Sequence, residues 1–81
     1  MAVMMKAADP ASWTMVYQRI DTKREEAGLS WSQLAKLAGI KMKTWMTGLP
    51  ISHPTESEVR KIANVPQMNT TYEYLRYGIE N

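Results

Sequence analysis

Apolar residues recur along the chain at helical spacings, and short polar or glycine-containing stretches divide them into segments. We expect a first helix from residue 11 or 12 to residue 27, because one apolar stripe recurs there at spacings of three and four: Trp13, Val16, Tyr17 and Ile20. Asp9 or Ser12 can cap its start, and Gly28 ends it.

Two shorter helices are expected next, separated by a tight turn at Gly39. Ser30 begins the first, because Gln33 stands three residues on, at the spacing of a capping box. The apolar face of this helix is formed by Leu34, Ala35, Leu37 and Ala38. The second helix spans 42–47, and Trp45 and Ile40 tie it to the core. The side chains expected to face outward are Met42, Lys43, Met46 and Thr47.

A fourth helix begins near Thr55, with Glu58 completing another capping-box match. Its inner face consists of Val59, Ile62 and Ala63. Pro66 ends it, and a fifth helix follows over about 69–77, carrying Tyr72, Tyr74, Leu75 and Tyr77. No segment shows sustained strand alternation, so the pattern predicts an all-α, five-helix domain over 10–78, with an arm at 1–9 and a tail at 79–81.

Composition narrows the possible functions of this 81-residue chain. Because it contains no Cys, it can form neither a disulfide nor a thiolate metal site. The single histidine, His53, has no partner for nucleophilic catalysis, and we expect an ordinary loop residue there. The carboxylates are explained by helix caps and surface pairs. We therefore predict a non-enzymatic protein that needs no cofactor, metal or small-molecule ligand.

Charge and hydropathy also bear on partners and location. The formal net charge is +2, which permits nucleic-acid binding without demanding it. No apolar stretch approaches the length of a membrane span, and the first residues lack the layout of a secretory signal. We expect a cytoplasmic protein that is not attached to a membrane.

Residues 29–47 carry the functional signal. Two short helices joined by a tight glycine-containing turn define a helix-turn-helix. Ala35 lets the two helices approach closely, and Gly39 can adopt the left-handed conformation that the turn requires. A short helix with an exposed face fits the major groove of DNA.

The same residues resemble the XRE family of helix-turn-helix proteins, which includes the lambda-type phage repressors and Cro. The likeness covers roughly residues 17–78 and rests on these residues and motifs: Arg19-Ile20, Arg24 to Ser30, Leu34-Ala35, Ala38-Gly39-Ile40, Thr44-Trp45, Pro54, Ile62-Ala63 and Tyr74 to Gly78. It implies a lambda-repressor-like fold and a sequence-specific transcriptional regulator. A phage or prophage repressor that binds double-stranded operator DNA as a homodimer is the expected function.

The resemblance also assigns contacts with DNA. Residues 42–47 align with the family's recognition helix, and the base-reading positions fall on Met42, Lys43 and Thr47. Lys43 can donate to the O6 and N7 of guanine, whereas Met42 and Thr47 can touch a thymine methyl. The expected phosphate contacts are Trp31, Ser32, Lys36, Lys41 and Thr44.

The chain departs from the family pattern after the expected recognition helix. Where the family has Glu-Asn-Gly, this sequence has Leu49-Pro50-Ile51. The usual glutamate partner of Arg24 is therefore missing, and Glu25, Glu26 or a DNA phosphate could replace it. Lys23 stands where a buried leucine is common. We expect a reshaped connection between the third and fourth helices.

Several alternatives stay open at this point. Trp31 can pack against the first helix or present its indole N–H to a phosphate, and Tyr72, Tyr74 and Tyr77 can serve the core or a dimer surface. The apolar Met42 and Met46 on the expected outer face favour a second function. That alternative is a protein-binding module, an antirepressor or antitoxin-like partner that keeps the fold without operator binding.

Overall fold

The computed structural model describes residues 9–48 and 52–80, and all regular secondary structure in these residues is helical. The α-helices are α1 (Trp13–Glu26), α2 (Trp31–Ala38), α3 (Glu56–Ala63) and α4 (Tyr72–Tyr77). Two short 3₁₀ helices are η1 (Thr44–Thr47), between α2 and α3, and η2 (Pro66–Met68), between α3 and α4. The all-α class is confirmed for the described residues, but they contain four α-helices where five helices were predicted.

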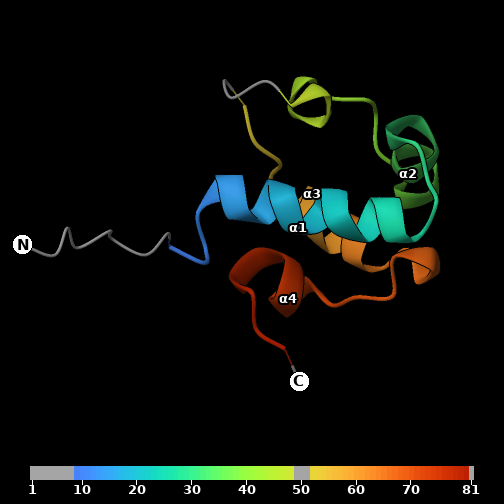
Figure 1. Ribbon diagram of the computed structural model, residues 1–81. Coiled ribbons are helices and arrows are strands. Elements are labelled where there is room, and N and C mark those ends of the chain that lie inside the picture. The colour runs from blue at the N-terminus through green and yellow to red at the C-terminus, as the bar shows by residue number, and fades with distance from the viewer. Residues whose placement is uncertain (1–8, 49–51, 81) are drawn as a thin grey trace, which may run out of the picture.

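The helices are arranged around α1, which crosses the middle of the molecule. Figure 1 shows η1 and α2 on one side of α1 and α4 on the other. α1 contacts α4, and α3 contacts both α2 and α4. Most of the predicted arm (residues 1–8), the Leu49-Pro50-Ile51 segment and Asn81 lie outside the described residues.

Hydroxyl side chains begin the helices where the sequence predicted them. The Ser12 hydroxyl accepts a hydrogen bond from the backbone N–H of Met15 and caps α1. Both predicted capping boxes are present, Ser30 with Gln33 at α2 and Thr55 with Glu58 at α3. Each box satisfies two backbone donors that a helix start leaves without partners. The beginnings of these three helices are therefore set locally.

The last helix begins later than predicted, at Tyr72 rather than near Asn69. Asn69 has a φ of 48°, a left-handed conformation that no α-helix continues through. The Thr71 hydroxyl then accepts a hydrogen bond from the backbone N–H of Tyr74 at 3.1 Å. Residues 69–71, which the apolar pattern assigned to the helix, therefore lie in the connection between η2 and α4.

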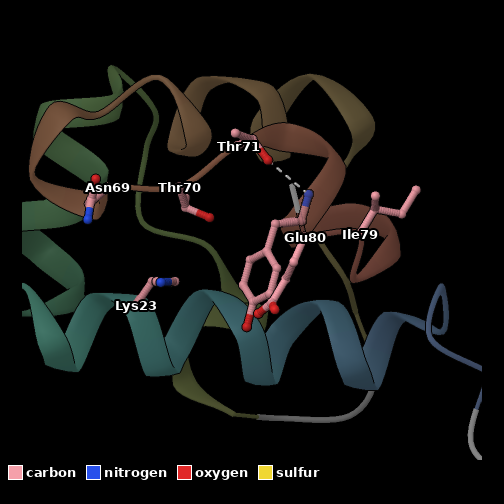
Figure 2. A pocket seen from close by; sticks show the side chains of 7 residues that line it. Lys23, Asn69, Thr70, Thr71, Ile79 and Glu80 are labelled. Atoms are coloured by element: carbon pink, nitrogen blue, oxygen red, sulfur yellow. Dashed lines mark hydrogen bonds between the residues drawn. The ribbon is translucent and has the colours of Figure 1, made fainter.

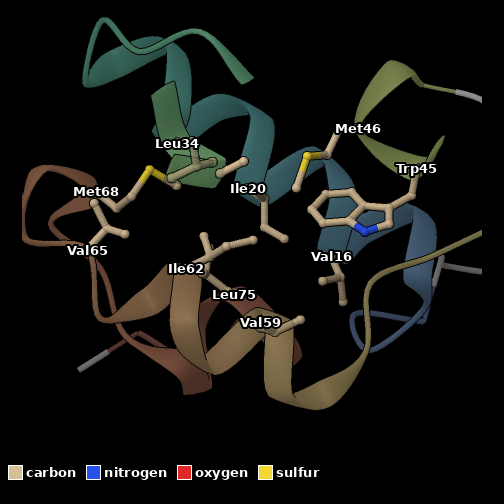
Figure 3. Close-up of a cluster of buried hydrophobic side chains, with 11 residues drawn as sticks. Val16, Ile20, Leu34, Trp45, Met46, Val59, Ile62, Val65, Met68 and Leu75 are labelled. Carbon is tan, nitrogen blue, oxygen red and sulfur yellow. The ribbon is translucent and has the colours of Figure 1, made fainter. Parts of the chain in front are cut away.

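One hydrophobic core joins all the elements (Figure 3). Its buried members are Val16, Ile20, Leu34, Ala35, Trp45, Met46, Val59, Ile62, Val65, Met68 and Leu75. The prediction that Leu37 faces inward is wrong, because this side chain is 48% exposed. At 100° per residue, Leu37 lies about 100° away from the centre of the face that Leu34, Ala35 and Ala38 share.

A buried arginine ties α1 to the segments at both ends of the described chain. The Nε of Arg19 donates to the carbonyl oxygen of Leu75 at 3.0 Å, and its Nη2 donates to the carbonyl oxygen of Pro10. Leu75 lies in the last turn of α4, where carbonyls have no partner within the helix. Burial lowers the pKa of Arg19 from its usual value, but a guanidinium stays charged in proteins.

A second polar cluster joins α3, α4 and the residues before α1. The Nε of Arg76 donates to Glu56 at 2.9 Å, and its Nη1 donates to the carbonyl oxygen of Ala11 at 2.6 Å. The Tyr72 hydroxyl also donates to Glu56. The hydrogen bonds from Tyr72 and, second, from Arg76 lower the pKa of Glu56. The hydrogen bond with Glu56 raises the pKa of Tyr72 to about 12.

Candidate nucleic-acid interface

The predicted turn after α2 is confirmed at Gly39. This residue has a φ of 73° and a ψ of 31°, the left-handed conformation that ends many helices. The N–H of Ile40 donates to the carbonyl oxygen of Ala35 at 3.0 Å, which satisfies a carbonyl at the helix end. Ile40 packs against the core, so residues 41–47 leave α2 in a defined direction.

Replacing Gly39 with alanine is expected to destabilise the protein by about 1–2 kcal/mol, because an L-residue pays that cost in the left-handed region. An added Cβ would meet no heavy atom within 4 Å, so backbone strain alone sets the size of the effect. Gly39→Asn should cost less, since asparagine tolerates this conformation. Urea denaturation of both variants checks the order; an alanine variant as stable as the parent would contradict it.

The prediction of a recognition helix over 42–47 is wrong in its geometry. Lys43 is extended, with a φ of −122° and a ψ of 155°, and only Thr44–Thr47 form a turn, which is 3₁₀ rather than α. No side chain caps this turn. A 3₁₀ helix has poorer hydrogen-bond geometry than an α-helix and is used in short pieces. Residues 41–43 thus form a strip outside the helices, with an extended backbone at Lys43, and one tight turn follows at Thr44–Thr47.

The turn buries two consecutive side chains. Trp45 is 3% exposed, as predicted, but Met46 is 1% exposed, so the prediction that it faces outward is wrong. With three residues per turn, Thr44 and Thr47 lie one above the other and face solvent. Trp45 and Met46 take the two remaining directions toward Val16 and the core (Figure 3).

Trp45 belongs to an aromatic cluster that joins η1 to α1 and α2. Its ring meets those of Trp31 and Tyr17 edge-on, at centroid distances of 5.6 and 6.4 Å. Trp31 stacks on Tyr17 at 5.6 Å, and the Arg24 guanidinium lies 4.8 Å from the Trp31 ring centroid. Trp31 thus packs against the first helix, as the sequence predicted, and its contact with phosphate stays a prediction.

Most of the predicted DNA contacts lie at the surface of α2 and the following strip. Met42 is 51% exposed and the Lys43 side chain is 48% exposed. The other exposed members of the predicted set are Ser32, Lys36, Lys41, Thr44 and Thr47. Thr47 donates its hydroxyl hydrogen to the carbonyl oxygen of Thr44 at 2.6 Å, which leaves its methyl group for apolar contact.

Glu58 is a residue at this surface that the sequence did not identify as part of the site. Its Oε2 lies 3.8 Å from the Nζ of Lys43, and the Glu58 side chain is 12% exposed. Its Oε1 accepts the backbone N–H of Thr55 at 2.9 Å. The capping box was visible in the sequence, but the contact with Lys43 joins residues far apart in the chain.

Arg24 pairs with Glu25, one of the partners that the sequence suggested, and more closely with Asp21, which the sequence did not suggest. Its Nη2 lies 2.7 Å from Asp21 and 3.5 Å from Glu25, and its Nη1 donates to the carbonyl oxygen of Leu29 at 2.6 Å. Glu26 instead pairs with Lys23. The spacing of three between Asp21 and Arg24 was the signal that could have found this pair.

A pocket of about 270 Å³ lies between α1 and the segment before α4. Figure 2 shows Lys23 and Thr70 facing this space, which Glu80 also lines. The Nζ of Lys23 lies 5.4 Å from the Tyr74 ring centroid and also pairs with Glu26, so this cation is already engaged. The lining therefore offers no concentrated charge of one sign.

The described residues contain no group of three acidic or histidine side chains placed to hold a metal ion. Within the same ranges, no helix combines the length and apolar character needed to cross a bilayer. Comparison of the chain with protein-family models, with curated proteins and with solved structures gives no match. The resemblance to the XRE family therefore stays a prediction.

Proposed function

We propose that this protein is a sequence-specific DNA-binding transcriptional regulator that contacts operator DNA through α2 and residues 41–47. The observation that carries the proposal is the arrangement of residues 41–47. Lys41, Met42 and Lys43 are exposed, whereas Trp45 and Met46 anchor the same segment in the core. A fixed segment that presents lysines outward is suited to a polyanion because its contacts need little further ordering.

The proposed contacts divide by chemistry. Lys43 reads guanine, and Met42 and Thr47 contact thymine methyl groups. The proposed phosphate contacts are Trp31, Ser32, Lys36, Lys41 and Thr44. A four-residue 3₁₀ turn rises only about 8 Å, so one subunit reaches few base edges. Binding as a homodimer to two half-sites compensates for this, and repression follows by occlusion of polymerase in the bacterial cytoplasm.

The test is selection of double-stranded DNA from a random-sequence pool, followed by fluorescence-anisotropy titration at two salt concentrations. We expect an enriched sequence with two related half-sites. The two phosphate-contacting lysines of each subunit, Lys36 and Lys41, predict about four such contacts per dimer, and affinity should fall roughly 10²-fold between 50 and 200 mM salt. Failure to enrich any sequence, or binding that ignores salt, would remove the proposal.

The two lysines Lys43 and Lys36 are expected to behave differently on substitution. Lys43→Ala should weaken binding to the selected duplex by about 1–3 kcal/mol and relax sequence preference, because a base contact is lost. Lys36→Ala should cost less and do so equally on selected and scrambled duplexes, since phosphates carry no sequence information. Equal effects of both variants on discrimination would contradict the assignment of Lys43 to base reading.

A second candidate function rests on apolar exposure at this surface. Leu37 and Met42 are 48% and 51% exposed, on α2 and on the strip that follows it. Exposed apolar side chains favour a protein partner more than a phosphate backbone. The alternative proposal is thus an antirepressor or antitoxin-like module. It predicts no sequence enrichment in the selection above and loss of partner binding on Met42→Lys.

A further inference from the structure

The Lys43–Glu58 pair is longer than the two tightest ion pairs of the described residues and joins the residues before η1 to α3. The Nη2 of Arg24 lies 2.7 Å from Asp21, within hydrogen-bond distance. The Nε of Arg76 lies 2.9 Å from Glu56. Lys43 and Glu58 are 3.8 Å apart, which is too long for a hydrogen bond. The carboxylate therefore attracts the ammonium without taking up any of its three N–H donors.

The two partners are unequally restrained. Glu58 is held at its backbone N–H, which donates to the Thr55 hydroxyl at 3.1 Å, and at its carboxylate, which accepts the Thr55 N–H. With a side chain only 12% exposed, it is a fixed negative charge. Lys43 precedes η1 with an extended backbone and carries a flexible four-carbon side chain, which is 48% exposed.

We propose that Glu58 is a positioning residue that orients the Lys43 ammonium for base recognition, a role that rests on the proposed DNA-binding function. A free lysine loses rotamer entropy when it must reach one base edge, and prior orientation reduces that cost. A contact with phosphate gains less, because phosphates are available in many positions along the backbone. Glu58 therefore contributes to sequence discrimination more than to overall affinity.

The test compares the parent, Glu58→Gln, Lys43→Met and the double variant. Each is titrated with a duplex selected by the parent from a random pool and with a scrambled duplex. Glutamine preserves the capping box, so Glu58→Gln removes the charge while α3 keeps its start. We expect Glu58→Gln to reduce the ratio of the two affinities about three- to tenfold, chiefly through weaker binding of the selected duplex. In the Lys43→Met background it should cause no further loss.

The control for a change in net charge is Glu73→Gln, at an exposed position in the first turn of α4. It should leave the affinity ratio unchanged. Tighter binding of Glu58→Gln to both duplexes, an unchanged ratio, or an equal loss with and without Lys43 would each overturn the positioning role. If the parent selects no sequence, the proposed function fails, and the role of Glu58 fails with it.

Discussion

Replacing Trp45 with alanine is expected to destabilise the protein by about 3–5 kcal/mol, the range for removing a buried aromatic side chain. The side chain is 3% exposed and contacts two other aromatic rings. A domain of this size has a total stability of roughly 4–12 kcal/mol, so the loss is a large share of it. Urea denaturation followed by circular dichroism measures the change.

Trp45→Phe is the matched control for this substitution. The buried indole N–H of Trp45 has no hydrogen-bond partner among the residues that the structure describes, which costs about 1–3 kcal/mol. Phenylalanine loses some packing but removes this unsatisfied donor, so its net effect should stay below about 1.5 kcal/mol. A phenylalanine variant as unstable as the alanine variant would contradict this account. The backbone amides of residues 41–47 should lose protection from hydrogen exchange in Trp45→Ala but not in Trp45→Phe.

Replacing Arg19 with methionine is expected to cost about 3 kcal/mol, because two charge-assisted hydrogen bonds to backbone carbonyls are lost. The carbonyl of Leu75 would be left without a donor at the end of α4, and that of Pro10 would lose its tie to α1. Methionine fills similar space, so the loss reports the polar contacts. Thermal and urea unfolding both measure it.

Two variants on the same helix set the scale for Arg19→Met. Arg19→Lys keeps the charge but cannot fork to two carbonyls, so its cost should be intermediate. Lys23→Met removes a partly exposed cation from α1 and should change stability by less than about 1 kcal/mol. If Arg19→Met were as mild as Lys23→Met, the hydrogen bonds of Arg19 to the carbonyl oxygens of Leu75 and Pro10 would contribute little to stability.

The parts of the fold that local chemistry controls were predictable from the sequence. Ser30 with Gln33 and Thr55 with Glu58 follow a fixed spacing, and Gly39 is the residue type that a left-handed position requires. Each of these signals lies within one turn of chain. The starts of α2 and α3 and the turn after α2 were therefore predicted from a few residues each.

The parts that depend on packing were not predictable in the same way. An α-helical period over 42–47 turned Met46 outward, whereas a 3₁₀ turn buries it beside Trp45. The choice between the two periods depends on the space that the core leaves for both side chains. The contact between Glu58 and Lys43 similarly depends on how α3 packs against the residues before η1. No local sequence pattern encodes the 3.8 Å distance between the Lys43 Nζ and the Glu58 Oε2.

The perpendicular indoles of Trp31 and Trp45 have a spectroscopic consequence. Their centroids are 5.6 Å apart with an interplanar angle of 85°, so their electronic transitions couple and give chiral signals in the near ultraviolet. Trp13 stacks instead on His53 at 4.1 Å. The coupled bands therefore report on the docking of η1 against α2, and they let an observer follow that segment without an attached dye.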